Sequence, residues 1–298
     1  MEKYDFIIIG GGPNGLTTAS YLSQAGQKVL VLDRNYELGG GLATERPGLP
    51  DFFHNTHSVW HMMVDYAPVY KDFNMEERDV KYIYPPLQFA MLFADGKDLC
   101  LYTDVDKTCA SIAQFSKKDA DAYKEMHKKF QSYMDEFLGP ATYVKAAPPL
   151  DQTVKLESTA IGKEISDYTS KSPQDIVNEW FENERVRAMM LYLACHWGLA
   201  PDVEGIGYMA VLYINRATNY RLCQSGSHKV SQAFVRVLNE NKATLLSPAE
   251  VKSIIVENGV AKGVEIVEAG GRVFEAEKAV ISSLDPPSTF IKLITEYI

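Results

Sequence analysis

The sequence predicts an α/β fold that is built around a parallel β-sheet. Residues 6–9 form an apolar run that leads into three spaced glycines, a helical segment and a second apolar run at 28–33. A later segment, 243–282, contains several short alternating runs that are typical of strands. Continuous apolar runs such as 6–9 indicate strands that are buried on both faces of a parallel sheet.

The glycines after the first predicted strand follow the pattern G-x-G-x-x-G. In this pattern Gly10 permits a tight turn, Gly12 lets the backbone approach a pyrophosphate, and Gly15 lets the helix pack closely on the strand. The helix predicted over 14–24 points its positive N-terminal end at the phosphates, and Gly26 ends it.

An acidic residue, Asp33, ends the second predicted strand 18 residues after Gly15. A carboxylate at this place accepts hydrogen bonds from ribose hydroxyls and repels a 2′-phosphate, so NADP is disfavoured. These features follow one another in the order and at the spacing that the motif requires: strand, glycines, helix, second strand and acidic residue. Together they predict a Rossmann-like dinucleotide-binding unit. The alternative is a fold of this type whose site is empty.

A second glycine cluster, Gly39-Gly40-Gly41, follows the acidic residue, and Thr44 comes shortly after it. NAD-dependent dehydrogenases have no general need for a second close approach of the backbone here. A dinucleotide with a ribityl-flavin tail has that need, because more of its length runs along the protein. A flexible turn explains such a cluster equally well, so the cluster alone leaves FAD and NAD open.

The segments "DFIIIGGGPNGLTTASYLSQAG" and "VLVLDRNYELGGGLATE" resemble the FAD-dependent amine oxidase and phytoene desaturase superfamily. The phytoene dehydrogenase-like branch is the most similar part of it. The resemblance implies FAD as the cofactor, although many relatives carry arginine where this chain has Gly41. It assigns to the cofactor Gly10, Gly12, Pro13, Asn14, Gly15, Asp33, Arg34, Gly39, Gly40, Gly41, Leu42, Thr44 and Val251.

The stretch from "CQSGSHKVSQAFVRV" to "AVISSLDP" resembles the second FAD-domain segment of the same superfamily. A helix is expected over 230–239, followed by strands at 243–246, 250–257, 260–267 and 272–282. Asn258-Gly259 between two alternating runs independently indicates a hairpin. The resemblance implies that the backbone of Val251 contacts adenine. It implies a discontinuous FAD-binding domain over 1–60 and 222–290, with 61–221 as an inserted α+β substrate domain.

Three histidines occur in "FFHNTHSVWHMM", at positions 54, 57 and 61. No acidic residue or cysteine accompanies them in a metal-ligand pattern, so no metal site is predicted. In relatives this segment runs past the flavin ring, which makes His57 and His61 the candidate catalytic residues. A histidine can move a proton beside a hydride transfer because its pKa is ordinarily close to neutral. The alternative is that both are hydrogen-bonded structural histidines.

The composition restricts the possible partners. The net charge of −9 argues against a general nucleic-acid binder, because a polyanion would be repelled. Four cysteines without a CxxC pair indicate reduced thiols, and neither a secretory signal nor a membrane span is predicted. These features favour a cytoplasmic protein and leave peripheral membrane contact open.

The resemblance implies an FAD-dependent oxidoreductase of the desaturase, dehydrogenase or oxidase type, which takes hydride from a hydrophobic organic substrate. Two alternatives remain: an NAD-dependent dehydrogenase, and a non-catalytic protein of the Rab escort or GDP-dissociation inhibitor type. Gly15 favours true dinucleotide binding over the latter. Relatives continue beyond this sequence, so the C-terminal part of the usual fold is expected to be absent. A second polypeptide would supply that part, unless the chain is a truncated form or assembles as a homo-oligomer.

Overall fold

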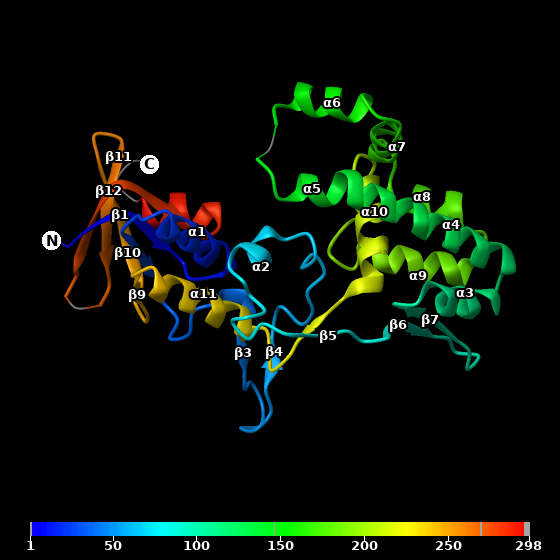
Figure 1. Ribbon diagram of the computed structural model, residues 1–298, viewed down its shortest axis with the longest axis horizontal. Helices are drawn as coiled ribbons and strands as arrows, with labels where there is room; N and C mark the ends of the chain where they lie inside the picture. The colour runs from blue at the N-terminus through cyan, green and yellow to red at the C-terminus, as the bar shows by residue number, and fades with distance from the viewer. Residues whose placement is uncertain (1, 146, 269, 295–298) are drawn as a thin grey trace. The chain divides into compact units, whose positions relative to one another are not determined.

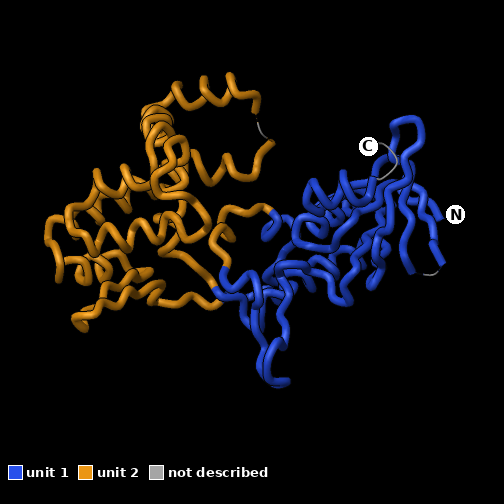
Figure 2. Tube along the Cα trace, turned by 180° about the vertical axis from the view of Figure 1, so that it is seen from behind, with its two compact units in different colours: residues 1–60, 69–82, 222–298 blue, residues 61–68, 83–221 orange. Residues whose placement is uncertain are grey.

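The computed structural model describes residues 2–145, 147–268 and 270–294, and the chain divides into two compact units. Unit 1 comprises Met1–Trp60, Val69–Tyr82 and Leu222–Ile298, and unit 2 comprises His61–Pro68 and Ile83–Arg221 (Figure 2). Residues 69–82 thus pack with unit 1, although they lie inside the stretch that the sequence analysis assigned to the substrate domain.

Unit 1 is built on a six-stranded sheet in the order β10-β11-β12-β1-β2-β9 (Figure 1). Strand β1 pairs in parallel with β2 and β12, and β2 pairs in parallel with β9, whereas β10 and β11 are antiparallel. The strands are β1 (Glu2–Ile9), β2 (Val29–Leu32), β9 (Thr244–Leu246), β10 (Val251–Glu257), β11 (Val260–Ile266) and β12 (Val273–Ser282).

Both faces of this sheet are covered by apolar packing. Alternate side chains of a strand point to opposite faces, so Ile8 and Ile7 belong to two different cores. The core around Ile8 includes residues of α1 (Pro13–Gln24) and α11 (His228–Glu240). The core around Ile7 includes residues of β11 and of the π-helical segment η4 (Pro287–Leu293). Burial on both faces explains the continuous apolar run that predicted β1.

The elements that the sequence predicted in unit 1 are confirmed with small shifts at their ends. The helix expected over 14–24 is α1, the helix expected over 230–239 is α11, and the four late strands are β9 to β12. Asn258 and Gly259 adopt φ angles of 52° and 77° and form the hairpin turn between β10 and β11. Short segments follow in the same unit: η1 (Gly40–Leu42), β3 (Thr44–Glu45) and β4 (His54–Asn55).

Unit 2 is mainly helical and contains an antiparallel strand pair. The pair is β6 (Leu87–Leu92) and β7 (Asp98–Tyr102). The helical segments are α3 (Val105–Ala113), α4 (Lys117–Tyr133), η2 (Met134–Leu138), α5 (Gly139–Thr142), α6 (Pro149–Glu157), α7 (Ala160–Thr169), α8 (Pro173–Trp180), α9 (Glu184–Cys195), α10 (Gly207–Arg216) and η3 (Ala217–Asn219). Short segments at the sequence boundaries of the units are α2 (Pro68–Asp72), β5 (Tyr82–Ile83) and β8 (Leu222–Cys223).

Polar side chains set where several helices of unit 2 begin. Ser172 caps α8 in a reciprocal capping box with Asp175, and Asn183 caps α9. Such caps satisfy backbone N–H groups that have no partner inside the helix. Among the helices that the structure describes, none has both the length and the apolar composition required to span a bilayer.

Candidate dinucleotide-binding site

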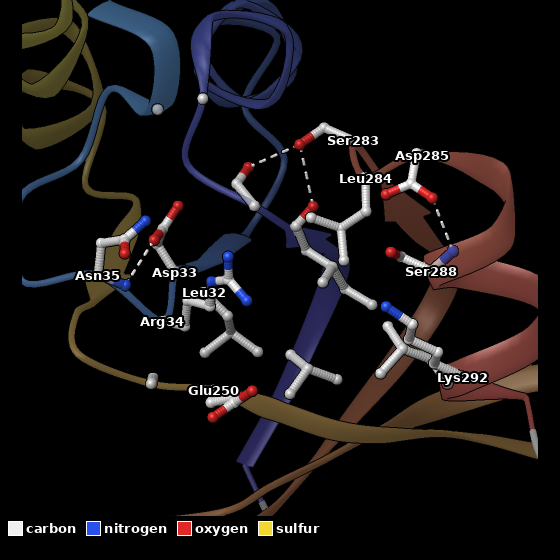
Figure 3. Close-up of a pocket in the computed structure, with 17 residues that line it drawn as sticks. Leu32, Asp33, Arg34, Asn35, Glu250, Ser283, Leu284, Asp285, Ser288 and Lys292 are labelled. Atoms are coloured by element: carbon white, nitrogen blue, oxygen red, sulfur yellow. Dashed lines mark hydrogen bonds between the residues drawn. The ribbon is translucent and has the colours of Figure 1, made fainter. Parts of the chain in front are cut away.

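A cleft of about 380 Å³ opens at the carboxyl ends of the parallel strands of unit 1 (Figure 3). Its walls come from the turn after β1, the residues after β2, the start of β10 and the segment after β12. In open parallel sheets this edge is where ligands bind, because the loops that leave the strands splay apart there. Of the residues predicted to bind the cofactor, six line the cleft: Gly10, Gly12, Asp33, Arg34, Gly40 and Val251.

The three motif glycines have different surroundings. A Cβ atom on Gly15 would lie 2.0 Å from the carbonyl oxygen of Gly10, so only glycine permits this packing of α1 on the turn. Gly10 has a φ of 94°, a conformation that other residues rarely adopt. A Cβ on Gly12 would meet no atom within 4 Å. Gly12 therefore borders open space in the cleft at the start of α1, where a phosphate can approach the backbone closely.

Asp33 is buried at the edge of the cleft, with 7% of its surface exposed. Its two carboxylate oxygens accept hydrogen bonds from the backbone N–H groups of Gly11 and Asn35, both at 2.7 Å. These bonds fix the orientation of the carboxylate. Each oxygen keeps further acceptor capacity, which suits the ribose hydroxyls that the sequence predicted for this residue.

The second glycine cluster packs back on the first turn. The N–H of Gly39 donates to the carbonyl oxygen of Gly11 at 2.8 Å, and a Cβ on Gly40 would lie 3.1 Å from the Cα of Gly12. Gly39 and Gly40 have φ angles of 140° and 52°. Gly39 and Gly40 thus form a tight backbone contact that requires glycine, whereas a Cβ on Gly41 would have only an ordinary contact of 3.9 Å with the Cβ of His57. Of the three, only Gly40 lines the cleft.

The other predicted cofactor residues lie outside the cleft lining. Pro13 and Asn14 are exposed at the first turn of α1, Gly15 is buried beneath the turn, and Leu42 is a core residue. Thr44 holds the start of α11: its hydroxyl donates to Asn55 at 2.9 Å and accepts from the N–H of His228 at 3.1 Å. In this structure Thr44 therefore connects two segments of unit 1 that are distant in sequence.

The two candidate catalytic histidines belong to different units. His57 is exposed in unit 1, and His61 in unit 2 forms a backbone bridge with Arg221. Burial lowers the pKa of His61 to about 4, so its ring is neutral at pH 7 and a weak proton acceptor. Across the described residues, no group of three or more His, Cys, Asp or Glu side chains is arranged to hold a metal ion.

The wall of the cleft that follows β12 was not predicted from the sequence. Ser283, Leu284 and Lys292 line the cleft there. Ser283 is placed by the parallel pairing of β1 with β12, in which Ile9 is opposite Ser282. A signal was available, because the carboxyl ends of neighbouring parallel strands meet at one edge, and 272–282 was already predicted as a strand.

Two positively charged side chains line the cleft in a protein whose net charge is −9. Arg34 follows β2 and Lys292 comes from η4 (Figure 3). Within the described part of the chain, neither forms an ion pair or hydrogen bond through its side chain. The cleft therefore contains positive charges that attract an anionic ligand, together with the carboxylates of Asp33, Glu250 and Asp285.

The fold and the cleft define a protein of the α/β class with a Rossmann-like dinucleotide-binding fold. Residues 8–74 match the family described as NAD(P)-binding Rossmann-like domain. The chain is 36% identical over 300 residues to a subunit of the limonene dehydrogenase of Castellaniella defragrans, covering 99% of this chain and 54% of that protein. It is 24% identical over 268 residues to 4,4'-diapophytoene desaturase of Methylomonas sp, covering 87% and 50%.

A crystal structure of an oxidoreductase from Methanosarcina mazei shares the fold, with a TM-score of 0.62 at 18% identity. The match covers 99% of this chain and 62% of that one. The chain belongs to the phytoene desaturase and amine oxidase superfamily of FAD-dependent proteins. It spans about half the length of the curated relatives that it matches.

Proposed function

We propose that unit 1 binds FAD in the cleft and that the chain is part of a flavin-dependent oxidoreductase. The observation that carries this proposal is the pairing of Gly12, which borders open space at the start of α1, with the oriented carboxylate of Asp33 in the same cleft. The first feature suits a pyrophosphate and the second suits a ribose.

Each wall of the cleft has a role in this proposal. The first N–H groups of α1 receive the pyrophosphate, since they have no partner inside the helix. Asp33 accepts from the ribose hydroxyls, and the backbone of Val251 contacts the adenine. Arg34 and Lys292 offset the negative charge of the phosphates. When bound, the flavin supplies the capacity to accept a hydride, and the protein supplies binding and orientation.

Membership of an FAD-dependent superfamily supports FAD over NAD, and the open space beside Gly12 supports a dinucleotide over an empty site. The similarity to a limonene dehydrogenase subunit supports a hydrophobic organic substrate that loses hydride to the flavin. The same similarity supports a second polypeptide as partner. A homo-oligomer is the alternative assembly, and size-exclusion chromatography with light scattering separates the two.

The first test is the visible absorbance spectrum of the purified protein, with chromatographic identification of any cofactor that denaturation releases. We expect flavin bands and released FAD. Released NAD would identify the nicotinamide alternative. A colourless protein that does not take up added FAD would contradict the proposal and favour a binding protein of the Rab escort type.

Gly12→Val places the test on the cleft itself. The new side chain occupies the open space beside the turn, so we expect at least a tenfold loss of FAD affinity, about 1.4 kcal/mol or more. Because no atom lies within 4 Å of that Cβ position, the variant should fold normally. Gly48→Val is the matched control, since Gly48 also has free space and lies on an exposed loop. Full FAD content in Gly12→Val would show that the site is wrongly assigned.

A further inference from the structure

The peptide bond between Gly10 and Gly11 is held at both ends by side chains from neighbouring strands. Its carbonyl oxygen, on Gly10, lies 3.0 Å from the Ser283 hydroxyl, which donates to it. Its N–H, on Gly11, donates to the Asp33 carboxylate at 2.7 Å. Asp33 follows β2 and Ser283 follows β12, and these two strands lie on either side of β1. The peptide bond that follows β1 is therefore held from both sides.

Ser283 is itself rigidly placed. It directly follows β12, and its backbone N–H donates to the carbonyl oxygen of Ile9 at 2.9 Å. Its hydroxyl also lies 3.0 Å from that same oxygen, so one hydroxyl hydrogen is shared between the carbonyls of Ile9 and Gly10 (Figure 3). A serine held by its backbone presents its hydroxyl at a fixed point.

The Gly10 carbonyl is closely packed, and the Ser283 hydroxyl is part of that packing. A Cβ on Gly15 would lie 2.0 Å from this oxygen and 3.0 Å from the Ser283 hydroxyl oxygen. A Cβ on Gly10 would lie 2.5 Å from the same hydroxyl. The carbonyl is thus enclosed between the start of α1 and Ser283. Loss of the hydroxyl would leave it without this donor and free the turn to reorient.

We propose that Ser283 is a positioning residue that, together with Asp33, orients the phosphate-binding turn by clamping the Gly10–Gly11 peptide. The proposal rests on the proposed function, because it assigns the turn to a pyrophosphate. We call this pair of hydrogen bonds, from Ser283 and to Asp33, the clamp. The clamp sets how the next peptide groups, up to Gly12 and the start of α1, are oriented toward the cleft. It therefore acts on ligands that carry a pyrophosphate and has little effect on a nucleoside that lacks one.

The test compares ADP with adenosine as ligands of the full chain, by calorimetry or by displacement of bound FAD. In Ser283→Ala we expect ADP and FAD to bind about tenfold more weakly, as for the loss of one hydrogen bond, and adenosine to change less than about twofold. Ser288→Ala is the matched control, because Ser288 lines the same cleft and its side chain hydrogen-bonds to Asp285 on the same segment instead of to the Gly10–Gly11 peptide. It should change neither affinity.

An equal loss for ADP and adenosine, or no loss for either, would overturn the clamp. A wild-type protein that binds neither ADP nor FAD would instead overturn the proposed function. Ser283→Thr covers the case in which the alanine variant fails to fold, as judged by circular dichroism. Because threonine keeps the hydroxyl, ADP affinity should stay within about threefold of wild type. A threonine variant that folds but has lost most of its affinity for ADP would also refute the clamp.

Discussion

The two units differ in what their buried interiors contain. The centre of unit 1 is made of apolar strands, and side chains such as Ile7, Ile8 and Leu30 have no exposed surface. The interior of unit 2 is also apolar, at side chains such as Phe130 and Leu193, but it contains in addition a charged residue. This residue, Arg216, is 2% exposed and donates to Asp65 at 2.8 and 2.7 Å. Its guanidinium also lies 5.1 Å from the ring centre of Tyr66.

The candidate site of unit 1 and the buried ion pair of unit 2 therefore depend on the sequence in different ways. In unit 1 the candidate site is formed mainly by the backbone, at positions where glycine allows close approach, so a short motif suffices to describe it. In unit 2 the arrangement depends on side chains that meet from distant parts of the sequence, such as Arg216 with Asp65 and Tyr66 with Asp135. Substitutions should therefore act in unit 2 by unpairing charges and in unit 1 by filling space.

The largest effect is expected where a charge loses its partner in unit 2. Asp65→Asn leaves the buried Arg216 without a counter-charge and should lower the free energy of unfolding by about 3 kcal/mol. Asp95→Asn is the matched control in the same unit, because Asp95 pairs with the more exposed Arg185 at 2.8 Å. That exposed pair should contribute no more than about 1 kcal/mol. Urea denaturation measures both, and equal losses would show that burial of Arg216 does not determine the effect.

A smaller effect is expected where a methyl group fills space in unit 1. Gly15→Ala puts a Cβ 2.0 Å from a backbone oxygen, so the helix or the turn has to move. We expect a loss of about 2 kcal/mol in the free energy of unfolding, as for other overpacked sites. Gly48→Ala has free space and should change little. The contrast fails if both alanine variants unfold at the same denaturant concentration.

The sequence was sufficient for features that are local and periodic. Gly10, Gly12 and Asp33 lie within 24 residues of one another and follow a fixed spacing, so their place in one cleft could be predicted. The strands β9 to β12 were predicted because alternation and the Asn258-Gly259 turn are local signals.

Features that depend on distant pairings could not be predicted from one sequence. Ser283 reaches the first turn only because β12 pairs in parallel with β1, which begins more than 270 residues earlier. Thr44 was assigned to the cofactor from its motif, and the motif gave no sign that its hydroxyl also bonds Asn55 and the start of α11. The burial of Arg216 likewise has no local signal, since a lone arginine at the end of a helix is usually solvated.

The smallest effect is a pH dependence that tests the environment of His61 in unit 2. Burial lowers the pKa of His61 from its ordinary value of 6.5 to about 4. Between these pH values the unfolded chain binds more protons at this residue, so the free energy of unfolding falls as pH falls through the window. From pH 7 to pH 6 His61 should account for a loss of about 0.7 kcal/mol, which His61→Gln removes. His57→Gln, at an exposed site, should leave the wild-type pH dependence in place. If the free energy of unfolding changes equally with pH in wild type and His61→Gln, His61 does not have this buried environment.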